Sequence, residues 1–174
     1  TLLKDCKNTG EVIGTGKLIA GIIGHAQSGN ISNCVNAGNV YAQESTLQDI
    51  CIGGMVGLMK SKCNIEHCVN TGNVTVIGEY KENTCNYAGG IVGLAELSTL
   101  EYQFNNCINK GNVTGMGKRI GSISGQIAGN TKNCIKKLSM KIDKIKDIIP
   151  LATKHIAINL FVDNSSNVKI IIIA

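Results

Sequence analysis

The chain of 174 residues is long enough for one domain with a buried core. It has 21 Gly, no Trp and only two Phe, which excludes a large aromatic core and favours short β-strands that turn often. The net charge of +5 belongs to residues 130–174, because residues 1–129 contain nine basic and nine acidic side chains. A neutral body lacks the basic track that phosphate backbones require, so no nucleic-acid partner is expected.

One short motif recurs from the first residues onward. Its copy at residues 34–40 reads Cys-Val-Asn-Ala-Gly-Asn-Val. Alternation along a strand places its Cys, Asn, Gly and Val on one face, which we expect to point inward. Stacked copies then predict an interior Cys column and an interior Asn column. The two columns consist of Cys6, Cys34, Cys68, Cys107 and Cys134, and of Asn8, Asn36, Asn70 and Asn109.

A second motif lies between the copies of the first. It reads Gly-Gly-Ile-Val-Gly at residues 89–93, and its other copies are at residues 20–24, 53–57 and 124–128. We expect one of its columns to face inward and the neighbouring column, which ends in Gln126, to face outward. The inward column consists of Ile23, Val56, Val92 and Ile127.

The spacing of the motifs predicts the fold. Successive Cys positions are 28, 34, 39 and 27 residues apart, so the motifs are constant while the connectors vary in length. This is typical of solenoids, in which each coil contacts only its neighbours. We therefore predict an all-β, right-handed parallel β-helix (β-solenoid) of about four to five repeats over residues 1–136, with two or three strands per coil. The glycines at positions 10, 38, 72 and 111 are expected at corners that need positive φ or close backbone approach.

Residues 137–174 depart from both motifs. Apolar residues at 138, 142, 145 and 149 fit one face of a helix, with Ser139 as its N-cap and Pro150 after its end. Residues 155–162 and 168–174 predict a β-hairpin around a polar turn. We expect this helix and hairpin to form a C-terminal cap on the β-helix or the start of a neighbouring domain.

The two motifs together resemble a known repeat. Residues 30–40, which read Asn-Ile-Ser-Asn-Cys-Val-Asn-Ala-Gly-Asn-Val, and the Gly-Gly-Ile-Val-Gly motif resemble the GLUG-motif repeats of bacterial and protist surface proteins. The resemblance covers about residues 1–136. It implies a β-helix in a large extracellular protein, where it serves as stalk, spacer or adhesive surface, and it supplies no catalytic residues.

The acidic residues test an alternative function, a β-helical polysaccharide-active enzyme such as a lyase or glycoside hydrolase. Such an enzyme needs paired carboxylates or a calcium site along one face. No column of the repeat is acidic in two successive copies, so we predict a non-enzymatic module. Cys63, His67 and Cys68 lie close together, but no second pair with metal-ligand spacing accompanies them, and no metal or cofactor is expected.

The eight cysteines leave two interpretations open. Neighbouring coils lie within disulfide range, yet stacked interior cysteines also behave as small apolar residues. Cys51, Cys63 and Cys85 lie outside the Cys column and are the better candidates for pairing or reactivity. Four Asn-x-Ser/Thr triplets match the acceptor sequence of N-glycosylation in a eukaryotic secretory pathway, but the recurrence of Asn-Val-Thr in the repeat itself is the stronger explanation for them. They begin at Asn30, Asn73, Asn112 and Asn164.

These patterns predict a structural and adhesive repeat module of a larger surface or secreted protein. Its variable connectors, at residues 41–51, 75–88 and 94–103, are where ligand contacts are expected, because they differ while the motifs do not. The expected partner is a host or cell-surface glycan or protein, the expected location is extracellular or at the cell surface, and no direct membrane insertion is expected. The connector residues that we expect to contact it are Tyr41, Tyr80, Tyr87 and Tyr102.

Overall fold

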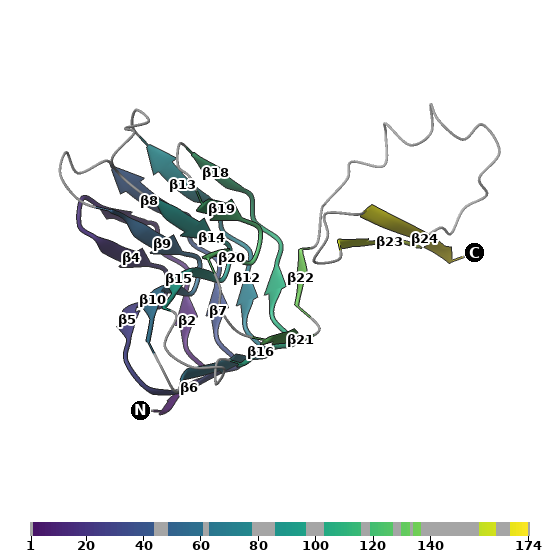
Figure 1. The fold of residues 1–174 in the computed structure, drawn as a ribbon, viewed down its shortest axis with the longest axis horizontal. Helices are drawn as coiled ribbons and strands as arrows, with labels where there is room; N and C mark the ends of the chain where they lie inside the picture. The colour runs from purple at the N-terminus through teal and green to yellow at the C-terminus, as the bar shows by residue number, and fades with distance from the viewer. Residues whose placement is uncertain are drawn as a thin grey trace.

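A computed structural model describes residues 2–43, 49–60, 63–77, 86–96, 103–115, 119–126, 130–132, 134–136, 157–162 and 168–173. All regular structure in these residues is β-strand. The strands stack in parallel into five sheets, and one further pair is antiparallel (Figure 1). The prediction of an all-β repeat with stacked parallel strands, as in a β-solenoid, is confirmed.

Each complete coil contains five short strands. The first coil has β1 (Leu2–Lys4), β2 (Lys7–Asn8), β3 (Val12–Gly14), β4 (Leu18–Ala20) and β5 (Ile23–Ala26). The second has β6 (Gly29–Ser32), β7 (Val35–Asn36), β8 (Val40–Gln43), β9 (Cys51–Gly53) and β10 (Val56–Met59). The third has β11 (Cys63–Glu66), β12 (Val69–Asn70), β13 (Val74–Ile77), β14 (Tyr87–Gly89) and β15 (Val92–Ala95). The fourth has β16 (Gln103–Asn105), β17 (Ile108–Asn109), β18 (Val113–Gly115), β19 (Arg119–Gly121) and β20 (Ser124–Gln126). The described part of the fifth has β21 (Asn130–Lys132) and β22 (Ile135–Lys136).

Equivalent strands of successive coils form the sheets, which we number in the order in which a coil passes through them. Sheet 1 is β1-β6-β11-β16-β21, sheet 2 is β2-β7-β12-β17-β22, sheet 3 is β3-β8-β13-β18, sheet 4 is β4-β9-β14-β19 and sheet 5 is β5-β10-β15-β20. Neighbouring strands of such sheets lie about 4.8 Å apart. Each residue of a motif therefore sits beside its counterparts in the coils before and after it.

Five strands per coil contradict the prediction of two or three. One corner of each coil is made by a non-glycine residue with φ between 52° and 57°, immediately before the Cys of the first motif. These corner residues are Asp5, Asn33, His67 and Asn106. Of the two alternatives predicted for the motif glycines, positive φ is not observed, and close backbone approach applies to Gly38, Gly72 and Gly111 but not to Gly10. A Cβ on Gly72 would overlap the carbonyl oxygen of Gly38, and a Cβ on Gly111 would overlap that of Gly72.

The second motif is aligned differently from the prediction. Val92 pairs with Val56 in the coil before and with Ser124 in the coil after, so the fourth copy covers residues 121–125 and not 124–128. The predicted outward column is also wrong, because Met55 and Ile91 are both 0% exposed and belong to the core. Both residues lie in the bend between sheets 4 and 5, where strand alternation does not apply.

The buried side chains form two separate clusters. The larger cluster lies between sheets 1 and 5 and includes the Cys column, with Ile65, Met55 and Phe104 among its large members. The smaller cluster lies between sheets 3 and 4 and is built from residues such as Val40 and Ile52. Burial of these aliphatic columns at about 25 cal/mol per Å² is the main source of stability that the fold offers.

Sheets 4 and 5 approach each other backbone to backbone. A Cβ on Gly57 would lie 3.0 Å from the carbonyl oxygen of Cys51, and one on Gly93 would lie 2.7 Å from the amide nitrogen of Ile52. The last glycine of the second motif therefore has no room for a side chain. Because sheet 4 packs against sheet 3 through the smaller cluster, its strands in the middle coils are enclosed from both sides.

The C-terminal part is described in two strands. β23 (Ala157–Val162) and β24 (Val168–Ile173) pair antiparallel, as the sequence predicts, and form a sheet apart from the five stacked ones (Figure 1). The predicted helix at residues 138–149 lies outside the described residues. Within the part of the chain that the structure describes, no helix is long and apolar enough to cross a membrane.

Candidate functional surfaces

The interior asparagines form a continuous ladder of side-chain hydrogen bonds. Nδ2 of Asn36 donates to Oδ1 of Asn70 at 2.8 Å, and Nδ2 of Asn70 donates to Oδ1 of Asn109 at 2.9 Å. Asn8 makes the same bond to Asn36 at 2.9 Å. Each Nδ2 also donates to the carbonyl oxygen of the glycine two residues later. Asn36, Asn70 and Asn109 are fully buried, so the ladder satisfies polar groups that are otherwise costly to bury.

The ladder changes at the fourth coil. In the fifth coil Lys136 pairs in register with Asn109, where the earlier coils have Asn. Nδ2 of Asn109 donates instead to the carbonyl oxygen of Ser122 at 2.7 Å. Ser122 occupies the place of Gly90 in the second motif, so the two motifs contact each other at the point where the ladder ends.

The Cys column is a set of stacked thiols. Cys34, Cys68 and Cys107 are 0% exposed, and Cys6 and Cys134 are half-buried. Cys6, Cys34, Cys68 and Cys107 are free thiols in the structure. The three buried members each donate Sγ–H to the carbonyl oxygen two residues earlier, and the acceptors are Ser32 (3.2 Å), Glu66 (3.3 Å) and Asn105 (3.4 Å). These thiols therefore act as small buried donors.

Burial makes the thiol at the second coil a poor acid, and this predicts an alkaline loss of stability. Burial raises the pKa of Cys34 to about 11, from about 9 in an unfolded chain. Between these two values the unfolded chain loses its proton while the folded chain keeps it, so the free energy of unfolding falls as pH rises. We expect Cys34 to contribute a decrease on the order of 1–3 kcal/mol between pH 8.5 and pH 11. Urea unfolding at several pH values measures the decrease, and Cys34→Ala, which lacks this thiol, should show a shallower one.

The structure does not bring Cys63, His67 and Cys68 together at one site. Sγ of Cys63 donates to the carbonyl oxygen of Ala26 at 3.6 Å, while Cys68 belongs to the Cys column. His67 is exposed, and its Nε2 lies 3.1 Å from Nδ2 of Asn106. In the part of the chain that the structure describes, no three His, Cys, Asp or Glu side chains form a group that could hold a metal ion.

The cysteines outside the column differ from the expectation of reactive thiols. Cys63 is 0% exposed and Cys51 is 2% exposed, so reagents in solvent do not reach them in the folded chain. Burial also raises the pKa of Cys63, which lowers the thiolate fraction further. Cys85 lies outside the described residues.

Of the four tyrosines, the structure describes Tyr41 and Tyr87, and it places them in different sheets. Tyr41 is half-buried on the outward side of sheet 3, in register with Ile13 and Thr75. Tyr87 lies in sheet 4, where the guanidinium carbon of Arg119 is 5.7 Å from its ring centroid. The two rings therefore do not form one contact surface. Tyr80 and Tyr102 lie outside the described residues.

Apolar side chains on the outer surface mark candidate contact areas. Ile13 is 60% exposed and Ile77 is 48% exposed, and both belong to sheet 3. On sheet 2 the outward column Val35, Val69 and Ile108 is half-buried. Ile13 and Tyr41 are register partners, so an exposed aliphatic residue lies directly beside a tyrosine on this face.

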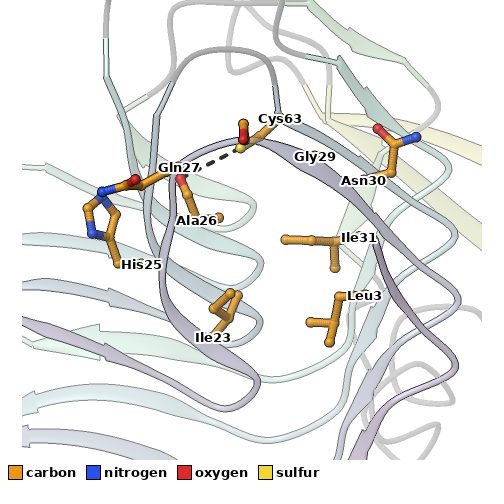
Figure 2. Close-up of a pocket in the computed structure, with 10 residues that line it drawn as sticks. Leu3, Ile23, His25, Ala26, Gln27, Gly29, Asn30, Ile31 and Cys63 are labelled. Carbon is orange, nitrogen blue, oxygen red and sulfur yellow. Dashed lines mark hydrogen bonds between the residues drawn. The ribbon is translucent and has the colours of Figure 1, made fainter. Parts of the chain in front are cut away.

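A cavity of about 330 Å³ lies at the first coil, and no sequence pattern indicates it. Leu3, Ile23 and Ile31 point toward its centre, while His25 and Gln27 lie on the far side of β5 and the turn that follows it (Figure 2). Its wall combines aliphatic side chains with polar groups of Gln27, Ser28 and Asn30, and it lies where β5 of the first coil leads into β6 of the second. Nε2 of His25 is buried and has no hydrogen-bond partner among the described residues.

Comparison with known proteins finds no relative. No protein-family model, no curated protein and no solved structure matches the chain. The resemblance to GLUG-motif repeats therefore stays a prediction.

Proposed function

We propose that residues 1–136 are a rigid, non-enzymatic module of a larger extracellular or cell-surface protein, with an adhesive outer face. The observation that carries this proposal is the filled interior. Asn36, Asn70 and Asn109 bond to one another from coil to coil and are fully buried, so the shape of the coil needs no ligand or cofactor to be stable. A right-handed winding and kinship to GLUG-motif repeats are part of the same proposal.

Stacked coils of this kind behave as a stiff, nearly one-dimensional body. Such a body suits a spacer that holds other domains away from a surface. Its outer columns repeat at the same spacing on every coil, and this offers a partner several equivalent contacts. The partner that we propose is a glycan or a protein of a host or cell surface.

The most favourable contact area on the described surface is the Ile13–Tyr41 pair. Aromatic side chains with apolar neighbours are enriched at contact sites because they bury a large area at a small entropic cost. Ile13 is 60% exposed and is held by backbone pairing of β3 with β8, so its position is fixed before a partner arrives.

Binding to an array of glycans and extracellular-matrix proteins tests the proposal. We expect specific binding by the chain, and a loss of at least about tenfold when Ile13→Ser and Tyr41→Ala are combined. Ile77→Ser is the matched control, because Ile77 is also exposed on sheet 3 but has no tyrosine partner in register. A connector-shuffled chain tests the variable connectors in the same assay.

Two outcomes separate the parts of this proposal. If the folded chain binds nothing on the array, the adhesive role is wrong and the spacer role is favoured. If the chain cleaves a polysaccharide, and substitution of one acid such as Glu66→Gln abolishes cleavage, the module is an enzyme and the non-enzymatic proposal is overturned.

A further inference from the structure

A second column of asparagines runs along the outside of the solenoid. It consists of Asn39, Asn73 and Asn112, the last asparagine of the first motif in three successive coils. Oδ1 of Asn39 accepts a hydrogen bond from the backbone N–H of Asn73 at 2.9 Å, and Oδ1 of Asn73 accepts one from the N–H of Asn112 at 3.0 Å. These bonds hold the side-chain amides of Asn39 and Asn73 in place, while Asn112 contributes its backbone N–H.

The two asparagines of each motif bond to the next coil through opposite ends of the amide group, the inner one through Nδ2 and the outer one through Oδ1. In the inner ladder Nδ2 of Asn70 donates both of its protons, to Asn109 and to Gly72, and the residue is 0% exposed. In the outer column Asn73 uses Oδ1 for its contact with the next coil and is exposed to solvent. Because Oδ1 and Nδ2 lie on opposite sides of one planar group, fixing Oδ1 directs Nδ2 away from the next coil.

Two members of the outer column begin an Asn-Val-Thr triplet, at Asn73 and at Asn112. Strand alternation puts the Asn and Thr of each triplet on the outward face and the Val between them inward. Val74 is 0% exposed, while Oγ1 of Thr75 and Oγ1 of Thr114 lie 3.2 Å apart on the outer surface. An exposed Asn with a hydroxyl residue two positions later is the acceptor for N-linked glycans.

We infer that Asn73 and Asn112 are N-glycosylation sites, presented by the outer face of sheet 3. In the transfer a bond forms between Nδ2 and C1 of the donor sugar, the bond from C1 to the lipid pyrophosphate breaks, and one amide proton leaves to the transferase. The lipid pyrophosphate is the leaving group. Oδ1 is unchanged, so the hydrogen bond of Asn73 to the next coil survives modification. The inference rests on the proposed extracellular location, reached through a eukaryotic secretory pathway, which supplies the lipid-linked sugar donor and the transferase.

The chain contains its own matched control. Asn39 has the same place in the column and the same Oδ1 hydrogen bond, but Val40 and Tyr41 follow it, so it has no hydroxyl at the third position. Asn39 should therefore remain unmodified. The substitution Tyr41→Thr completes a triplet at Asn39 and should add a glycan there, because position 41 lies in register with Thr75, the hydroxyl residue of the Asn73 triplet.

Secretion of the full chain from a eukaryotic cell, followed by peptide mass spectrometry before and after enzymatic deglycosylation, tests the inference. We expect glycan mass on the peptides of Asn73 and Asn112, none on that of Asn39, and loss of all glycan from this column in the double variant Asn73→Gln, Asn112→Gln. Neighbouring coils are only about 4.8 Å apart, so glycans on both would crowd each other, and the single variants each leave one acceptor to report alone.

The result that overturns the inference is a folded, secreted chain in which Asn73 and Asn112 are both unmodified while a co-secreted reporter glycoprotein is glycosylated. Failure of the array experiment would leave this result unaffected, because secretion is imposed here and no partner is needed. Conversely, binding on the array by unmodified chain would support adhesion without supporting glycosylation.

Discussion

Replacing Asn70 by Ala is expected to lower the free energy of unfolding by about 3–5 kcal/mol. Asn70 is the middle of the ladder, and its side chain takes part in three hydrogen bonds, with Asn36, Gly72 and Asn109. All of these partners are buried in a site that excludes water. The substitution leaves one proton of Asn36 Nδ2 unpaired and removes a hydrogen bond from the carbonyl oxygen of Gly72 and from Oδ1 of Asn109, which keeps only its bond from the N–H of Gly111. The loss is measured by urea unfolding followed by circular dichroism.

The control for this prediction is Asn73→Ala, three residues away in the same coil. Asn73 is exposed and its side chain makes one hydrogen bond to a neighbouring coil, so its removal should cost less than about 1 kcal/mol. Asn8→Ala should fall between the two, since Asn8 is only half-buried at the start of the ladder. Equal losses in the free energy of unfolding for Asn70→Ala and Asn73→Ala would show that the inner ladder stabilises the fold no more than an exposed hydrogen bond does.

The first motif could be interpreted from sequence because its columns are chemically uniform. At residues 34–40 every second residue is buried, and the same four residue types recur in each complete copy at the same places. Register follows directly from such a pattern, because a slip by one residue would turn Asn36 and Val40 outward. The stacked parallel architecture could therefore be predicted from the sequence alone.

The corners and the alignment of the second motif could not be predicted from the sequence in the same way. The corner column contains Asp5, Asn33, His67 and Asn106, and although all three residue types are enriched at positive φ, the change of type from coil to coil hides the column in the sequence. In the fourth copy of the second motif, Ser122 and Ser124 replace the residues of the Gly-Gly-Ile-Val-Gly pattern between Gly121 and Gly125. Residues 124–128 also resemble the pattern, and this led to the wrong alignment. The pairing of Val92 with Ser124, which depends on the whole coil, decides the alignment.

The outer surface was the least predictable part. Whether a tyrosine contacts a partner depends on which sheet carries it, and Tyr41 and Tyr87 lie on different ones. The strands also extend further into the connectors than the motifs indicate, since β8 continues to Gln43 and β13 to Ile77. Connector residues such as Tyr41 are therefore held by backbone pairing, which the motif boundaries do not reveal.

Substituting Gly72 by Ala should be about as destabilising as removing an asparagine from the ladder. Its Cβ would overlap the carbonyl oxygen of Gly38 in the coil before, and backbone atoms cannot move aside as a flexible side chain can. Coils two and three would have to separate locally, which breaks the neighbouring backbone pairing of β7 with β12 and β8 with β13. We expect a loss of roughly 3 kcal/mol or more, measured as a fall in the thermal midpoint.

Gly10→Ala is the matched substitution, because Gly10 holds the same motif position in the first coil but a Cβ there would meet only Oδ1 of Asn8, at 3.7 Å. With no clash and no positive φ, the added methyl group mainly restricts the unfolded chain, so stability should be unchanged or rise by up to about 1 kcal/mol. Gly38→Ala keeps the comparison informative if Gly72→Ala fails to fold, since its Cβ would overlap the carbonyl oxygen of Gly10, between the first and second coils. A destabilisation as large at Gly10 as at Gly38 would mean that these glycines are required for backbone conformation, and that close packing of successive coils is not what selects them.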